Sequence, residues 1–192
     1  MQPLIDRIVK DEKRVKSQPN DSYRLAYPEF VRYFRELQVI ERHHLIIGAN
    51  FVYGWMPTIL EFKCEDPDRD LEQAVRILNR AKSVELIAEG DLQFLKEIIN
   101  NSLVGVSKLL HFVNPNLYSI WDSRVYGYIH GEELYPYRQT PANYLKDLTA
   151  CREVTEHAAF GPVFESITQK LGYNVTKLRA AELVMFMKGG RT

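Results

Sequence analysis

SLVGVSKLLHFVNPNLYSIWDSRVYGYIH, residues 102–130, is the stretch that decides the fold. Its pattern predicts a short apolar turn at Gly105, a helix that carries Lys108, a tight loop and a second helix. The first helix ends before Pro115, because the residue that precedes a proline is pushed out of the α region. Asp122 is placed to cap the second helix. The stretch therefore brings a lysine and a carboxylate, 14 positions apart (122 − 108), toward each other.

The pair of Lys108 and Asp122 suits amine-based nucleophilic chemistry. A protonated lysine, with an ordinary pKa of about 10.4, is a weak nucleophile, but burial disfavours its charged form. The neighbours of Lys108 are apolar, and a free amine there would attack a carbon that bears a leaving group and form a Schiff base. Asp122 would accept a proton, hold a water or stabilise a cationic, sugar-like transition state.

The same two residues also fit an ordinary ion pair between neighbouring helices, with Asp122 only as a helix cap. Burial lowers the pKa of a lysine and a close carboxylate raises it, so the two effects on Lys108 oppose each other. The sequence leaves both interpretations open.

The composition is that of a soluble globular protein. Of the 192 residues, 45% are hydrophobic and 26% are charged, which is ordinary for a folded domain. Basic and acidic residues number 25 each, so the overall charge gives no support to nucleic-acid binding, although a local basic patch stays open. We expect residues 1–192 to form a single all-α domain, or two packed helical lobes with a cleft.

No targeting, membrane or metal-binding pattern stands out. The N-terminal segment has no apolar signal core, and the longest apolar stretch, 44–60, is too polar to span a membrane. Cys64 and Cys151 are isolated and lack metal-site spacing. His43 and His44 are adjacent and are expected to point in different directions, which argues against zinc. We therefore expect a cytoplasmic protein with no metal or other cofactor, in an oligomeric state that the sequence does not give.

Apolar residues recur at helical spacing along most of the chain, and no segment shows the period-two alternation of a strand. We predict an all-α, multi-helix globular protein with roughly eight to ten helices. Residues 40–60 form either one central buried helix or two short helices hinged near Gly54 and Pro57. Further helices are expected at 2–16, 28–38, 70–82, 91–100, 141–152, 162–171 and 177–188.

The turn LVGVSK at 103–108, the loop around Pro115 and the helix start at Asp122 resemble the helix-hairpin-helix, Gly/Pro-rich-loop and aspartate motif of DNA glycosylases. The resemblance is strongest to the 8-oxoguanine glycosylase type of this HhH-GPD superfamily, in which a lysine and an aspartate form the catalytic pair. SKLLHF and IWDSRV, within the same stretch, also resemble a pattern in bacterial proteins associated with this fold. The resemblance implies a DNA glycosylase-like, all-α fold with a helix-hairpin-helix-like segment at 92–130.

By that resemblance Lys108 would be the Schiff-base nucleophile and Asp122 the catalytic carboxylate. The turn at Gly105 would present backbone amides to a DNA phosphate. Ser107 stands near the place of the family's second glycine, at the same contact, and Arg124 in the matching IWDSRV segment would also bind substrate.

A base flipped out of DNA would need a stacking pocket, and Trp121, Trp55 or Tyr53 would supply it. Core packing is the alternative role of Tyr53 and Trp55, because large aromatic side chains usually contribute to the core.

Three functions are consistent with these residues. The first is a glycosylase- or lyase-like enzyme that acts on a nucleobase–sugar bond of DNA, with Lys108 and Asp122 at its centre. The second is a non-catalytic module of the same fold that binds nucleic acid or a protein. The third is a helical enzyme on a small nucleoside-like substrate, which would explain the balanced charge.

Overall fold

The computed structural model describes residues 2–16, 21–83 and 85–189, and within them the chain forms ten α-helices and one 3-10 turn. These are α1 (Leu4–Glu12), α2 (Ser22–Glu36), α3 (Arg42–Trp55), α4 (Pro67–Lys82), α5 (Glu89–Ile98), α6 (Leu103–Val113), α7 (Ser123–His130), η1 (Pro136–Arg138), α8 (Pro141–Glu156), α9 (Phe160–Leu171) and α10 (Lys177–Lys188). In this part of the chain the only β-type pairing is an isolated bridge between Phe62 and Ile99. The all-α prediction is confirmed.

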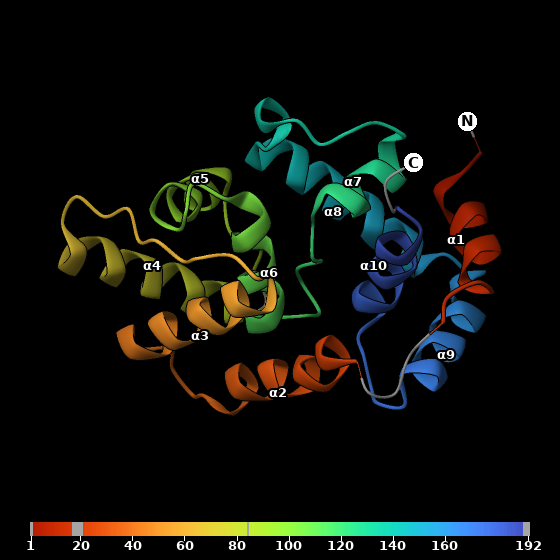
Figure 1. The fold of residues 1–192 in the computed structure, drawn as a ribbon, viewed down its shortest axis with the longest axis horizontal. Helices are drawn as coiled ribbons and strands as arrows, with labels where there is room; N and C mark the ends of the chain where they lie inside the picture. Colours follow the sequence, from red (N-terminus) through yellow and green to blue (C-terminus); the bar gives the residue numbers. More distant parts are fainter. Residues whose placement is uncertain (1, 17–20, 84, 190–192) are drawn as a thin grey trace.

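The helices form two groups that lie side by side (Figure 1). In one group α6 packs against α2, α3, α4 and α5, and in the other α10 packs against α1, α7, α8 and α9. A contact between α5 and α8 links the groups. Each group therefore surrounds one central helix, and most residues of α6 and α10 are buried.

The start of α6 differs from the predicted turn at Gly105. Ser102 caps α6 by accepting a hydrogen bond from the Gly105 amide at 3.2 Å, so Gly105 lies inside the first helical turn. The turn lies earlier, where Asn100 and Asn101 adopt left-handed φ values of 55° and 49°, a region that asparagine tolerates. A Cβ at Gly105 would lie 2.2 Å from the Tyr53 hydroxyl, so this glycine permits the close approach of α3 to α6.

The start of the second helix also differs from the one expected. The second helix begins at Ser22 and not at Pro28, because the Asp21 side chain accepts a hydrogen bond from the Tyr23 amide at 2.9 Å and caps it there. Of the two alternatives for residues 40–60, the structure shows the single helix, α3, which ends at Trp55.

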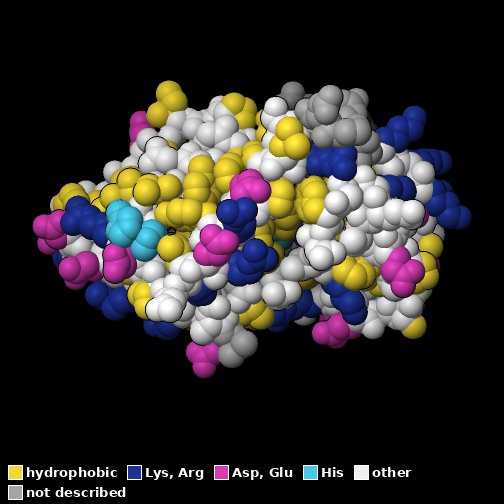
Figure 2. All heavy atoms as spheres, turned by 90° about the horizontal axis from the view of Figure 1, so that it is seen from below, with side chains coloured by type: hydrophobic (Ala, Val, Ile, Leu, Met, Phe, Trp, Pro, Cys, Tyr) yellow, Lys and Arg dark blue, Asp and Glu magenta, His cyan; other side chains and the backbone are white. Residues whose placement is uncertain are grey.

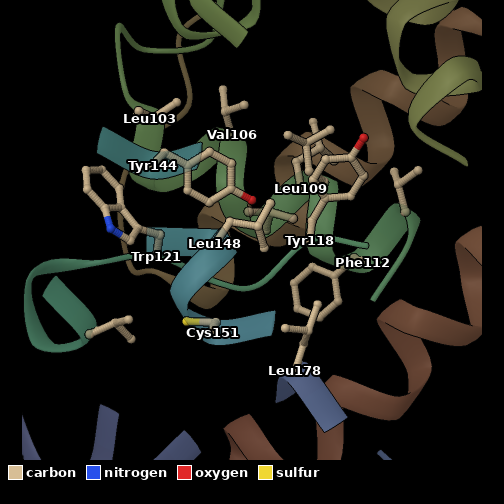
Figure 3. Close-up of a cluster of buried hydrophobic side chains, with 14 of the residues drawn as sticks. Leu103, Val106, Leu109, Phe112, Tyr118, Trp121, Tyr144, Leu148, Cys151 and Leu178 are labelled. Atoms are coloured by element: carbon tan, nitrogen blue, oxygen red, sulfur yellow. The ribbon is translucent and has the colours of Figure 1, made fainter. Parts of the chain in front are cut away.

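A cluster of buried hydrophobic side chains joins α6 to α8 and α10. Figure 3 shows Trp121, Tyr144 and Leu148 close together, with Phe112 next to Leu178. Trp121 and Tyr144 have ring centroids 5.9 Å apart. This packing fixes the segment that leads into α7. None of the helices described is both long enough and apolar enough to cross a lipid bilayer.

Candidate functional site

A pocket of about 590 Å³ is lined by residues from both groups of helices. Trp55 at the end of α3 and Lys108 on α6 contribute from the first group, and Asp122 at the start of α7 and Glu182 on α10 contribute from the second. Ligand pockets in proteins commonly measure about 300–1,000 Å³, so this volume is suitable for a molecule the size of a nucleotide.

Lys108 is half-buried in the wall of this pocket, with Nζ 5.7 Å from the ring centroid of Trp55. Burial lowers the pKa of Lys108 below its ordinary value, and the charges of Asp122 and Glu182 oppose that effect. Desolvation is the larger influence, so the site favours the neutral amine more than water does. Desolvation that makes a lysine less basic is one way in which proteins activate this amine as a nucleophile.

Asp122 caps α7, as the sequence predicts. Its Oδ1 accepts hydrogen bonds from the Arg124 and Val125 amides, each at 3.0 Å, while Oδ2 has no hydrogen-bond donor among the described residues. Because Asp122 also lines the pocket, Oδ2 is the oxygen left for a ligand or a proton. The hydrogen bonds at the start of α7 thus hold the carboxylate in place and leave Oδ2 free.

Ser107 fixes the approach to Asp122. Its Oγ accepts a hydrogen bond from the Trp121 amide at 3.1 Å and donates to the Val104 carbonyl at 2.8 Å, and the side chain is fully buried. The hydroxyl therefore ties α6, which carries Lys108, to the residue that precedes Asp122.

Ser107→Ala is expected to lower the free energy of unfolding by about 1–3 kcal/mol, because it leaves the buried Trp121 amide without an acceptor. Urea denaturation measures this change. Ser123→Ala, at an exposed position beside Asp122, is the control and is expected to stay within about 0.5 kcal/mol of wild type. Equal stabilities of the two variants would contradict the role given to Ser107.

A buried ion pair that the sequence did not predict lines the pocket. Arg179 Nη1 donates to Glu182 Oε2, and both side chains are almost fully buried. The guanidinium carbon of Arg179 lies 4.5 Å from the ring centroid of Tyr27 and 5.9 Å from that of Trp55. Burial raises the pKa of Glu182, and the attraction of Arg179 opposes the rise. A signal existed: Arg179 and Glu182 are three positions apart, on one side of a helix whose other residues from Leu178 to Met187 are apolar, which favours burial of the two charges together.

Of the aromatic residues predicted to stack on a ligand, the structure places only Trp55 in the pocket wall. Trp121 is 1% exposed, and its Nε1 donates to Asp147 Oδ2 at 2.8 Å. Tyr53 is 2% exposed, and its hydroxyl group donates to the Ile99 carbonyl at 3.4 Å. Both are core residues whose polar atoms are satisfied by the protein, so neither faces a ligand in this pocket.

The other three predicted binding residues differ in whether they line the pocket. Arg124 lines the pocket and lies over Phe186, with its guanidinium carbon 4.6 Å from the ring centroid. Gly105 and Ser107 are buried away from it, and the Gly105 amide is used by Ser102. The expected contact between the Gly105 amide and a phosphate is therefore not available, because the residue lies inside α6 and not in an exposed turn.

One cluster with metal-ligand chemistry occurs among the described residues, at the start of α3. Ligand atoms of Glu41, His43 and His44 lie within 4.8 Å of one another. The expectation that the two histidines point apart is wrong, since their ring centroids are 3.8 Å apart. The cause is the helix cap, in which His44 Nδ1 accepts from the Glu41 amide at 3.0 Å. The cluster lies at the opposite end of α3 from Trp55, and we assign no metal to it.

The charges around the pocket favour an anionic or polar ligand. Its lining includes six basic side chains (Lys16, Arg24, Lys108, Arg124, Lys170 and Arg179) and three acidic ones (Asp21, Asp122 and Glu182). On the face in Figure 2, Lys and Arg gather near the end formed by α1 and α9, and elsewhere they are mixed with Asp and Glu. No family model, curated protein or solved structure matches this chain.

Proposed function

We propose that this protein is a glycosylase- or lyase-like enzyme that cleaves a nucleobase–sugar bond, with Lys108 as the nucleophile and Asp122 as the assisting carboxylate. The observation that carries the proposal is that both side chains line one pocket, together with Trp55. The pKa of Lys108 is lowered by burial, which increases the fraction of free amine. The resemblance of residues 102–130 to DNA glycosylases supports the same chemistry.

In the proposed reaction the free amine of Lys108 attacks C1′ of the sugar. A bond forms between Nζ and C1′, the bond between C1′ and the base nitrogen breaks, and its electron pair leaves with the base, which takes up a proton. Asp122 Oδ2 accepts the proton that Nζ loses. The lone pair on Nζ then forms the C=N bond as the C1′–O4′ bond breaks, O4′ takes the proton held by Asp122, and a protonated Schiff base remains between C1′ and Nζ.

DNA is the first candidate substrate, because a base flipped out of the helix would enter a pocket of this kind while basic side chains of its lining contact the phosphates. A free nucleoside or nucleotide is the second candidate. The balance of 25 basic and 25 acidic residues favours the small substrate, since a duplex binder is usually basic.

Borohydride trapping tests the proposal. With borohydride present, the wild type is expected to form a covalent adduct with an oligonucleotide that contains a damaged base or an abasic site, or with a free nucleoside. Reduction of the Schiff base makes the bond permanent, and peptide mass spectrometry is expected to place it on Lys108.

Lys108→Ala is expected to lose the adduct entirely. Lys96→Ala is the matched control, because Lys96 is also half-buried but lies on α5 outside the pocket lining, and it is expected to retain the adduct. A failure of the wild type to form an adduct with any of these substrates would reject the enzyme and favour a binding module. An adduct that survives in Lys108→Ala would reject Lys108 as the nucleophile.

A further inference from the structure

The last turn of α1 and the residues that follow it form a basic surface, which we call the basic end of α1. It consists of Lys10, Lys13, Arg14 and Lys16, which are all exposed. The three lysines make no ion pair with a described residue, and this includes Asp6 in the first turn of the helix. Figure 2 shows Lys and Arg gathered at this end of the molecule. A chain with balanced overall charge therefore has a local concentration of positive charge.

The two acidic residues inside the same stretch are turned toward the protein. Asp11 Oδ2 accepts a hydrogen bond from the Tyr128 hydroxyl at 3.1 Å, and Asp11 Oδ1 lies 3.9 Å from Arg14 Nη1. Glu12 is 9% exposed and is bonded to Lys170 on α9. Because both carboxylates are engaged by other residues, the charge of the three lysines faces solvent without a direct partner.

The basic end of α1 reaches the pocket that holds Lys108 and Asp122, because Lys16 is part of its lining. Arg124, at the start of α7, is a second exposed cation of the lining and makes no ion pair with a described residue. Its guanidinium lies over the ring of Phe186, which restricts the position of the charge. Unpaired cations therefore enter the lining from two separate parts of the chain.

The lining also includes an exposed aromatic side chain. Tyr23, at the start of α2, is 50% exposed and meets Trp55 edge-on, with ring centroids 5.6 Å apart and an interplanar angle of 63°. An edge-on contact leaves at least one face of each ring uncovered by the other. Proteins that hold single strands of nucleic acid combine aromatic rings, on which bases stack, with cations that follow the backbone.

We propose that the substrate of this pocket is a single-stranded nucleic acid, whose backbone runs over the basic end of α1 and whose neighbouring base stacks on Tyr23. The inference rests on the proposed function in that it names the form of the substrate. A polynucleotide carries a phosphate on each side of every internal sugar, so Lys16 and Arg124 each find an anion. A free nucleotide supplies a phosphate on one side only.

A single strand fits these observations better than a duplex does. The chain as a whole is neutral, whereas a duplex carries one negative charge per ~1.7 Å of its axis and is usually bound by basic proteins. A base in a single strand is unpaired, so its entry into the pocket costs less free energy than extrusion from a double helix. The neighbouring base is also free to stack on Tyr23 only when it is unpaired.

Fluorescence anisotropy with a labelled DNA strand of about ten nucleotides, a usual footprint for such proteins, measures this binding without turnover. The strand is expected to bind about 5- to 150-fold more tightly than the same sequence as a duplex, in which no base is free to stack. An RNA strand of the same sequence distinguishes the two possible sources. Equal or tighter binding of the duplex, or equal competition by a polyglutamate peptide of the same charge, would overturn the proposal.

The salt dependence of the same binding tests the basic end of α1. Each phosphate contact of a single strand contributes about −0.7 to the slope of log K against log salt, so Lys13→Gln/Lys16→Gln is expected to reduce the magnitude of the slope by about 1.4. Lys63→Gln/Lys146→Gln removes the same charge from exposed positions outside the pocket lining and is expected to keep the wild-type slope. Identical slopes for the two double variants would contradict the role of this surface.

Tyr23→Ala is expected to weaken binding of the single strand about 5- to 150-fold, the effect of losing one stacked base. Tyr23→Phe retains the ring and is expected to retain the affinity. Tyr137→Ala removes a tyrosine that is 69% exposed but lies outside the pocket lining, and it is the control. Wild-type affinity in Tyr23→Ala would reject stacking on this residue.

The two proposals fail in different ways. A wild type that gives the borohydride adduct with a free nucleoside but does not bind the single strand would overturn this inference and leave the enzymatic proposal in place. Binding of the single strand that weakens as expected in Lys13→Gln/Lys16→Gln and in Tyr23→Ala supports the inference, even if no adduct forms on Lys108 and the enzymatic proposal is abandoned.

Discussion

Asp122→Asn is expected to lower the rate of base release and adduct formation by about 10²- to 10⁴-fold, the usual contribution of a positioned acid or base. Asparagine caps a helix about as well as aspartate, so its side-chain oxygen keeps the bonds to the Arg124 and Val125 amides. The substitution therefore removes the charge and the proton acceptor while the start of α7 stays in place.

The direction of the effect separates two roles of this carboxylate. Asp122 raises the pKa of Lys108, so its loss lets burial lower that pKa further and increases the fraction of free amine. If the supply of free amine alone limited the rate, Asp122→Asn would be faster than wild type near neutral pH. A large decrease in rate is expected only if Asp122 takes part in the chemical step.

Single-turnover kinetics on the substrate that gives the borohydride adduct measure this effect. Asp66→Asn is the matched control, because Asp66 caps α4 by the same kind of bond, to the Arg69 amide, and lies outside the pocket lining. It is expected to react at the wild-type rate. An unchanged or higher rate in Asp122→Asn, with an intact thermal unfolding transition, would show that Asp122 acts only as a helix cap.

The parts of the site that depend on local sequence were predictable. A proline that stops a helix and an aspartate that starts the next one are local signals, and they correctly gave the end of α6 and the cap of α7. The all-α class followed from the periodicity of apolar residues. The position of Gly105 was not predicted correctly, because Ser102 starts the helix three residues earlier than the glycine suggested.

The parts of the site that depend on packing between distant segments were not predictable. Trp55 and Trp121 both lie in apolar stretches, and what separates them is the bond of Trp121 to Asp147, which is 26 residues away on α8. Arg179 enters the pocket because α10 is the central helix of the second group. A single sequence gives the burial of such a residue but not the cavity that it faces.

His111 gives the second large expected effect, a loss of stability in acid. The neutral ring fits its surroundings with the proton on Nδ1, which donates to the Tyr118 carbonyl at 2.7 Å, while Nε2 accepts from the Tyr27 hydroxyl at 2.8 Å. Burial lowers the pKa of His111 to about 3, and the nearby charge of Arg179 acts in the same direction. Protonation would remove the acceptor for Tyr27 and place an unpaired charge in the core.

Because the folded protein holds His111 neutral, the unfolded chain binds a proton more readily than the folded one below its ordinary pKa of about 6.5. This contribution to stability is complete above pH 6.5 and is lost as the pH falls toward 3, by an amount on the order of 4 kcal/mol. Urea denaturation from pH 7 to pH 4 measures the slope. His111→Gln keeps a donor and an acceptor but does not titrate, so its stability is expected to fall less steeply than that of the wild type.

The comparison uses the slope of the unfolding free energy against pH and not the absolute stability. Carboxylates contribute acid sensitivity to every variant, and a glutamine at position 111 will not reproduce both hydrogen bonds of the ring. His157→Gln, at an exposed position, is the control and is expected to keep the wild-type slope. Parallel curves for wild type and His111→Gln would mean that the folded protein accommodates a charged His111. The Tyr27 hydroxyl would then have to turn away from Nε2. The Tyr27 ring, over which the guanidinium of Arg179 lies, would lose its hydrogen bond to α6.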